Sequence, residues 1–186
     1  MRKLIAAVTA VMIMAVGFAG CNNDPLSVQN VQDTTASTEA TNATEPVKDK
    51  TYKETIDGIA ELFVDKGYME IAKDNANVTE MDASLIGAKE GKRYTTKYNN
   101  AEVLIELYSF DMSDAKLKET AEQTIKSVKE TGKFRIFQLD PVTAYVSDSD
   151  KFLLIYTDKS NPAEDSDNYK RMQEAIETFK AFPTVK

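Results

Sequence analysis

Histidine is missing from this chain of 186 residues, and cysteine occurs once, at Cys21. Without histidine there is no Ser–His or Cys–His nucleophile pair and no imidazole ligand for zinc. A single cysteine cannot form a disulfide within the chain, so the fold must depend on its hydrophobic core. The seven glycines are scattered singly. None of them therefore forms a glycine-rich phosphate-binding loop.

Basic residues are also fewer than acidic ones, 23 against 30, which gives a net charge of −7. Loss of residues 1–20, which hold two basic and no acidic residues, would take this to −7 − 2 = −9. Nucleic acids and anionic membrane surfaces attract proteins through Lys and Arg. The composition thus argues against nucleic acid as a partner, and against attraction to an anionic membrane by charge.

Residues 1–20 have the pattern of a secretory signal peptide. Arg2 and Lys3 precede a largely apolar run, residues 4–19, which is shorter than the roughly 20 apolar residues of a membrane-spanning helix. The segment Phe18-Ala19-Gly20-Cys21 resembles the lipobox of bacterial lipoproteins, with Phe18 where an aliphatic residue is usual. An ordinary cleaved export signal is the alternative. The lone thiol favours lipidation of Cys21, which would anchor the protein on the outer, extracytoplasmic face of the cell membrane.

The rest of the chain divides into a tether and one globular domain. Residues 21–50 are rich in Thr, Ser, Asn, Gln and Ala and contain no aromatic residue. Such a segment buries too little apolar surface to fold by itself and is predicted to be disordered. As a flexible coil, the 29 residues after Cys21 would span about 30 Å on average. Residues 51–186 are long enough for one hydrophobic core and too short for two.

In the first half of the domain, helical and strand patterns follow one another. Thr51 and Glu54 fit a capping box for a helix that Gly67 ends. Residues 68–82 have no clear pattern. Residues 84–97 are predicted to form a hairpin with its turn near 90–92, and residues 101–110 a strand. In that strand Val103, Ile105 and Leu107 face one side, with Glu102, Leu104, Glu106 and Tyr108 on the other.

In the second half, Ser113 is predicted to cap a helix over 114–131 that ends at Gly132. Strands are expected at 133–139, 142–147 and 151–157, the last two joined by the polar turn at 147–150. A final helix begins between 161 and 167 and carries its apolar stripe at Tyr169, Met172, Ile176 and Phe179. The order predicts an α+β, two-layer domain, with two or three helices on one face of a mainly antiparallel sheet of five or six strands.

Acidic residues are the first candidates for chemistry. Glu102 and Glu106 share a strand face but lie about 13 Å apart at the rise of a strand, too far for a catalytic pair. Asp148, Asp150 and the cluster from Asp158 to Asn168 could suggest calcium. An EF-hand starting at Asp165 fails, because Lys170 and Ile176 stand where Gly and Glu are required. Turn and cap hydrogen bonds explain these residues more simply, so no metal or cofactor is expected.

Tyrosines are the remaining candidates. Tyr94, Tyr98 and Tyr108 fall on neighbouring predicted strands, and an open sheet face could present them to a sugar or a peptide. The alternative is that they stabilise the sheet as cross-strand partners.

The segment Ile86-Gly87-Ala88-Lys89-Glu90-Gly91 and the strand end Ile105-Glu106-Leu107-Tyr108-Ser109-Phe110-Asp111 resemble small uncharacterised lipoproteins of Gram-positive bacteria. The resemblance covers the signal and residues 84–157. It implies the compartment and the fold class, but it brings no active residues.

The sequence favours a non-enzymatic binding or adaptor module, held at the membrane by lipid on Cys21, whose partner is an envelope protein or wall component. Two alternatives stay open: a small-ligand or metal-binding accessory lipoprotein, and a cell-wall hydrolase that uses carboxylates.

Overall fold

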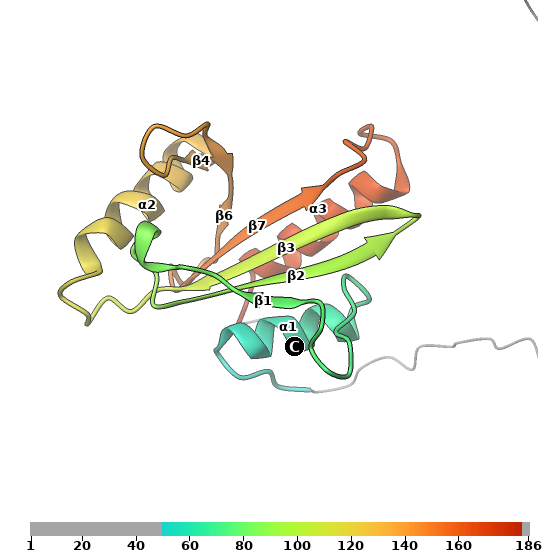
Figure 1. The fold of residues 1–186 in the computed structure, drawn as a ribbon, viewed down its shortest axis with the longest axis horizontal. Coiled ribbons are helices and arrows are strands. Elements are labelled where there is room, and N and C mark those ends of the chain that lie inside the picture. The colour runs from blue at the N-terminus through green and yellow to red at the C-terminus, as the bar shows by residue number, and fades with distance from the viewer. Residues whose placement is uncertain (1–49, 184–186) are drawn as a thin grey trace, which may run out of the picture. The chain divides into compact units, whose positions relative to one another are not determined.

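The structure, a computed structural model, describes residues 50–183. The predicted signal peptide, Cys21 and the predicted tether up to residue 49 lie outside the described residues. The elements in chain order are α1 (Ile56–Asp65), β1 (Val78–Glu80), the 3-10 helix η1 (Ser84–Ile86), β2 (Glu90–Tyr98), β3 (Ala101–Ser109), α2 (Lys118–Thr131), β4 (Lys133–Phe134), β5 (Val142–Thr143), β6 (Tyr145–Val146), β7 (Phe152–Asp158) and α3 (Asp167–Lys180) (Figure 1). Within residues 50–183, no helix has the length and apolar character needed to cross a membrane.

A five-stranded antiparallel sheet in the order β1-β2-β3-β7-β6 forms the centre of the domain. The strands β4 and β5 pair separately as a small second sheet. The predicted α+β class, with a mainly antiparallel sheet and helices packed on it, is therefore confirmed. The segment 68–82, which has no clear sequence pattern, supplies the short edge strand β1.

The two faces of the sheet carry separate hydrophobic clusters. Val103, Ile105 and Leu107 are buried on one face, together with apolar residues of α1 and α3. On the other face, Leu153 and Ile155 pack in a cluster with buried residues of α2 and η1. The structure thus differs from the expectation of helices on one face only. The alternation along β3 was predicted correctly, but the sequence pattern did not show that α2 covers part of the second face.

The turn of the β2–β3 hairpin lies at Asn99-Asn100, where φ is 46° and 64°. Asparagine tolerates these left-handed angles, which match the twist of a tight hairpin. The predicted turn near residues 90–92 is wrong, because β2 continues through Gly91, which pairs with Tyr108. A Cβ at Gly91 would lie 2.7 Å from the ring of Tyr108. This glycine therefore makes room for an aromatic ring rather than for a turn.

Helix ends were predicted better than helix starts. Gly67 and Gly132 follow α1 and α2 at φ values of 74° and 71°, as expected. The cap of α1, however, is Thr55, whose hydroxyl accepts a hydrogen bond of 3.1 Å from the amide of Gly58, and not Thr51. Ser113 does not cap α2, since its hydroxyl donates to Asp111 at 2.6 Å in a turn before the helix.

The predicted strand 133–139 is reduced to β4, because the chain leaves the sheet after Phe134. At Phe137 the backbone has a φ of 53°, which no regular strand adopts. Pro141 has no amide hydrogen to donate to a ladder. Residues 135–141 therefore form a loop between β4 and β5, while β6 and β7 form the predicted hairpin around 147–150.

A buried arginine on α3 connects this helix with the segment after α1 and with strands β2 and β7. Arg171 is 8% exposed, and its guanidinium lies 4.2 Å from the ring centroid of Tyr98. It donates to the hydroxyl of Tyr156 at 2.9 Å and to the carbonyl oxygens of Gly67, at 3.2 Å, and Tyr68. These carbonyls follow the end of α1, where the helix dipole is negative. The cation is thus stabilised by dipoles, a π-face and the charge of nearby Asp158, although its buried Nε has no hydrogen-bond partner in the described structure.

Replacement Arg171→Met keeps the length of the side chain and removes the donors, and it is expected to lower the free energy of unfolding by about 2–4 kcal/mol. Urea denaturation measures the loss. The matched control is Lys170→Met on the exposed side of α3, which we expect to change stability by less than about 0.5 kcal/mol. Equal stability of the two variants would contradict the role of Arg171.

Candidate functional site

The three tyrosines expected on an open face are placed differently by the structure. Tyr94 and Tyr108 are 2% and 6% exposed, and Tyr98 is half-buried. Tyr94 and Tyr98 lie on the face covered by α1 and α3, whereas Tyr108 belongs to the cluster under α2. An exposed binding surface made of these residues is therefore wrong. Their packing matches the alternative, in which they stabilise the sheet.

The surroundings of these phenols also make them poor acids. Burial raises the pKa of Tyr94 to about 12. Burial and a hydrogen bond that Tyr108 donates to Glu106, at 2.7 Å, raise the pKa of Tyr108 above its usual value. Both groups stay protonated at neutral pH, so neither serves as a general base.

Because Tyr94 is part of the core, we expect Tyr94→Ala to lower the free energy of unfolding by about 3–5 kcal/mol, as for other buried aromatic side chains. Thermal and urea unfolding measure this, with exposed Thr157→Ala on β7 as the control. Loss of a binding partner without loss of stability would restore a docking role for Tyr94.

The carboxylates on β3 are each paired with a cation. Glu106 lies 2.7 Å from Nη2 of Arg93 on β2, and Glu102 pairs with Lys159 after β7. Both are on the second face of the sheet, where Glu106 accepts a hydrogen bond from Tyr108 of the cluster under α2. In residues 50–183 the structure brings no three acidic or cysteine side chains together as ligands for a metal ion. Glu102 forms a partly exposed ion pair, whereas the side chain of Glu106 is only 12% exposed and is held by Arg93 and the hydroxyl of Tyr108. With both carboxylates paired, the arrangement favours a structural role over acid–base chemistry.

Asp158, from the acidic cluster considered for calcium, acts in a turn before α3. Its carboxylate accepts hydrogen bonds from the amide and hydroxyl of Ser160 at 2.8 and 2.6 Å, and from Asn168 at 2.8 Å. Burial by itself would raise the pKa of Asp158, but these hydrogen bonds outweigh it and hold the pKa below its usual value.

A carboxyl with a lowered pKa stabilises the fold above its unfolded-state pKa, about 3.9, and this contribution disappears as pH falls through the lower folded-state value. Asp158→Asn is therefore expected to flatten the acid side of the stability curve below about pH 4. Urea midpoints of both proteins across that range provide the measurement. Parallel curves would show that Asp158 is not responsible.

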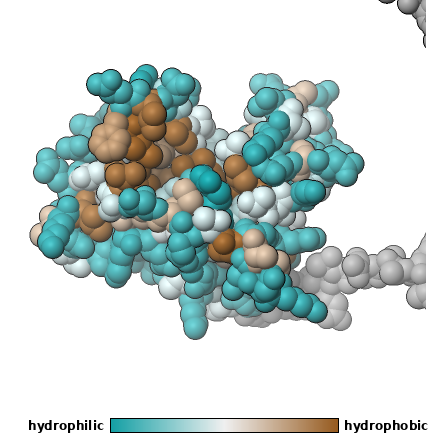
Figure 2. Space-filling view, in the orientation of Figure 1, coloured by the Kyte–Doolittle hydropathy of each residue, from teal (hydrophilic) through white to brown (hydrophobic). Residues whose placement is uncertain are grey.

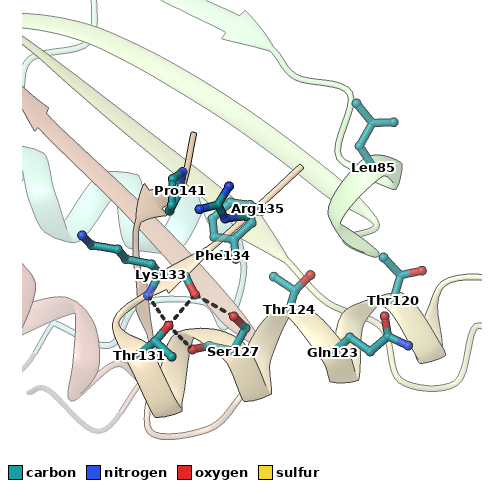
Figure 3. Close-up of a pocket in the computed structure, with 10 residues that line it drawn as sticks. All are labelled: Leu85, Thr120, Gln123, Thr124, Ser127, Thr131, Lys133, Phe134, Arg135 and Pro141. Carbon is teal, nitrogen blue, oxygen red and sulfur yellow. Dashed lines mark hydrogen bonds between the residues drawn. The ribbon is translucent and has the colours of Figure 1, made fainter. Parts of the chain in front are cut away.

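A groove of about 580 Å³ lies between α2, η1 and the β4–β5 region (Figure 3). On the α2 side, Thr120, Thr124 and Ser127 line it, and Figure 3 shows the side chains of Thr120 and Thr124 pointing into it. Leu85 of η1 lies at one end and Phe134, with its neighbours Arg135 and Pro141, at the other. The groove therefore combines hydroxyl groups with apolar ends.

Close contacts hold η1 and the start of β4 against α2. Gly87, at the end of η1, has a φ of 75°, and a Cβ there would lie 2.2 Å from the amide nitrogen of Ala121. At the other end, the hydroxyl of Ser127 donates to the carbonyl of Lys133 at 2.8 Å. The amide of Lys133 in turn donates to the hydroxyl of Thr131 at 3.2 Å. Both ends of the groove are thus attached directly to α2.

The charge of the groove differs from that of the chain. Of its ten lining residues two are cationic, Lys133 and Arg135, and none is acidic. Four other hollows on the described surface each include at least one carboxylate. In a chain with seven more acids than bases, this is a local reversal of charge.

Large apolar side chains are exposed beside the groove. Phe137 is 80% exposed, Leu139 64% and Leu85 46%. Figure 2 shows hydrophobic residues gathered over the region of α2 and β4. The sequence analysis did not identify this site. The signal present in the sequence is a row of small hydroxyl residues on α2, Thr120, Thr124, Ser127 and Thr131, next to the buried stripe.

Comparison with known proteins found no matching family model, no matching curated protein and no matching solved structure.

Proposed function

We propose that this protein is a lipid-anchored, extracytoplasmic lipoprotein whose domain is a non-enzymatic binding module of the cell envelope. The anchor is supported by the Phe18-Ala19-Gly20-Cys21 segment after a short apolar run, and by Cys21 being the single cysteine. An anchored module keeps its partner, an envelope protein or wall component, close to the membrane.

The observation that carries the binding role is the groove along α2, with its two cations, its hydroxyl groups and no carboxylate. Lys133 and Arg135 suit carboxylate or phosphate groups of a ligand, and Arg135 can bind such groups with two donors. Thr120, Thr124 and Gln123 can exchange hydrogen bonds with hydroxyl or amide groups. The preferred partner is thus anionic and carries many hydrogen-bonding groups.

A small-ligand accessory lipoprotein is the second candidate. The groove volume of about 580 Å³ lies in the range typical of small-molecule sites. The third candidate, a carboxylate hydrolase, has less support, because Glu102 and Glu106 are engaged with Lys159 and Arg93.

Crosslinking in intact cells, followed by mass spectrometry, tests the proposed function. The protein with its groove intact is expected to retain one dominant envelope component. Lys133→Glu with Arg135→Glu should reduce the retained amount of that component by about tenfold or more. Each replacement puts a carboxylate, which repels an anionic partner, in place of a cation that attracts it. Cys21→Ala should release the protein from the membrane fraction.

The matched control is Lys66→Glu with Lys73→Glu, which changes the net charge equally at exposed lysines that do not line the groove. Full retention by the groove variant would rule out the groove as the binding site. If the Cys21→Ala protein stayed in the membrane fraction to the same extent as the unaltered protein, lipidation of Cys21 would be ruled out as the anchor.

A further inference from the structure

We propose that the loop over residues 135–141 inserts Phe137 and Leu139 into the interfacial region of the lipid bilayer, so that the anchored domain lies on the membrane in one orientation. The inference rests on the proposed lipid anchor, and it adds a second membrane contact, made by the domain itself. Phe137 and Leu139 are the two most exposed large apolar side chains of the described residues.

The loop holds these side chains outward. Phe137 adopts a φ of 53°, an angle that is costly for a residue with a bulky side chain and is retained where the surroundings enforce it. The amide of Leu139 donates to the carbonyl of Ile136 at 3.2 Å, which closes a turn around Phe137. Phe134, before the loop, is 3% exposed, and Ile136 and Val142 pack against the same core cluster. The base of the loop is fixed while its tip faces outward.

The size of the apolar tip favours lipid over a protein partner. Two side chains with these exposed fractions offer roughly 250 Å², whereas a standard protein interface buries about 800 Å² on each side. A bilayer needs no matching surface, and a few apolar side chains suffice to orient a domain that is already tethered.

The charge near the tip is compatible with a membrane. Lys133 and Arg135 precede Phe137, and one exposed carboxylate, Asp140, directly follows Leu139, so residues 133–141 carry two cations and one anion. Cations beside inserted apolar groups extend their charged ends toward lipid headgroups. Because the whole chain is acidic, the attraction comes from apolar insertion and not from net charge, so vesicles of phosphatidylcholine are the suitable probe.

The length of the N-terminal segment permits this orientation. Lys50 begins the described part of the chain and lies 2.6 Å from Asp65 at the end of α1, which packs on the sheet face opposite α2 and the loop. From Cys21 to Lys50 the chain has 29 steps, which reach at most about 100 Å when extended. A lipid on Cys21 and a loop on the far face can therefore contact the same membrane.

Fluorescence provides the test, because the chain has no tryptophan. Residues 21–186 with Cys21→Ser and Phe137→Trp carry a single indole at the loop tip and no lipid. Phosphatidylcholine vesicles are expected to shift its emission to the blue, and brominated lipid chains to quench it. The matched control is Val64→Trp on α1, an exposed apolar position on the other face, whose emission should not change.

Vesicle sedimentation of the same unlipidated chain without tryptophan gives the second measurement. Phe137→Asn with Leu139→Ser should weaken vesicle binding by about tenfold or more. Asparagine accepts the left-handed backbone, so this variant is expected to fold with unchanged or higher stability.

An unshifted Phe137→Trp emission, or equal sedimentation of the two chains, would overturn the proposal. It would also be overturned if the loop variant lost its crosslinked protein partner but still bound vesicles. These results are distinct from failure of the proposed function, which concerns release of the Cys21→Ala protein and retention by the groove.

Discussion

The two helices on one sheet face are held in register by a cation that has no carboxylate within reach of an ion pair in the described structure. Arg171 contacts the π-face of Tyr98, the phenol of Tyr156 and the carbonyls that follow α1. Dipoles at these positions replace the water that the buried guanidinium loses. Because α3 carries the cation and its contacts come from the segment after α1 and from β2 and β7, displacement of any one of them would leave the charge poorly solvated. This constraint couples the position of α3 to the sheet and to the end of α1.

The sequence was sufficient to predict the fold class because burial imposes a period on strands and helices. The alternation of Val103, Ile105 and Leu107 indicates a strand with one buried face, and the glycines after α1 and α2 indicate helix ends. Each of these local patterns is typical of one kind of structure. Other local patterns are compatible with two kinds of structure. Gly91 resembles a turn residue but makes room for the ring of Tyr108, and Ser113 resembles a cap but bonds to Asp111. Such choices depend on neighbours that only the folded chain brings together.

The candidate site was harder to predict than the fold. The groove joins η1, α2 and the loop after β4, which are separated in the sequence by up to 56 residues from Leu85 to Pro141. Each contributes ordinary residues, and no motif marks them. The tyrosines were predicted as a binding surface because an aromatic side chain on a strand is compatible with either an exposed face or the core. Tyr94 faces α1 and Tyr108 faces α2, and the sequence did not show that a helix covers the second face.

The contact between Gly87 and the backbone of Ala121 has a consequence for how this groove can vary among related chains. Any side chain at residue 87 would meet α2, at a backbone angle that also disfavours it, so the spacing between η1 and α2 is in effect constant. If the groove binds a ligand as proposed, adaptation to a new one would proceed by exchange of side chains such as Leu85 and Thr120, while the distance between η1 and α2 stays the same. Under the proposed binding role, single substitutions at these positions would change specificity while the architecture around the groove stays the same.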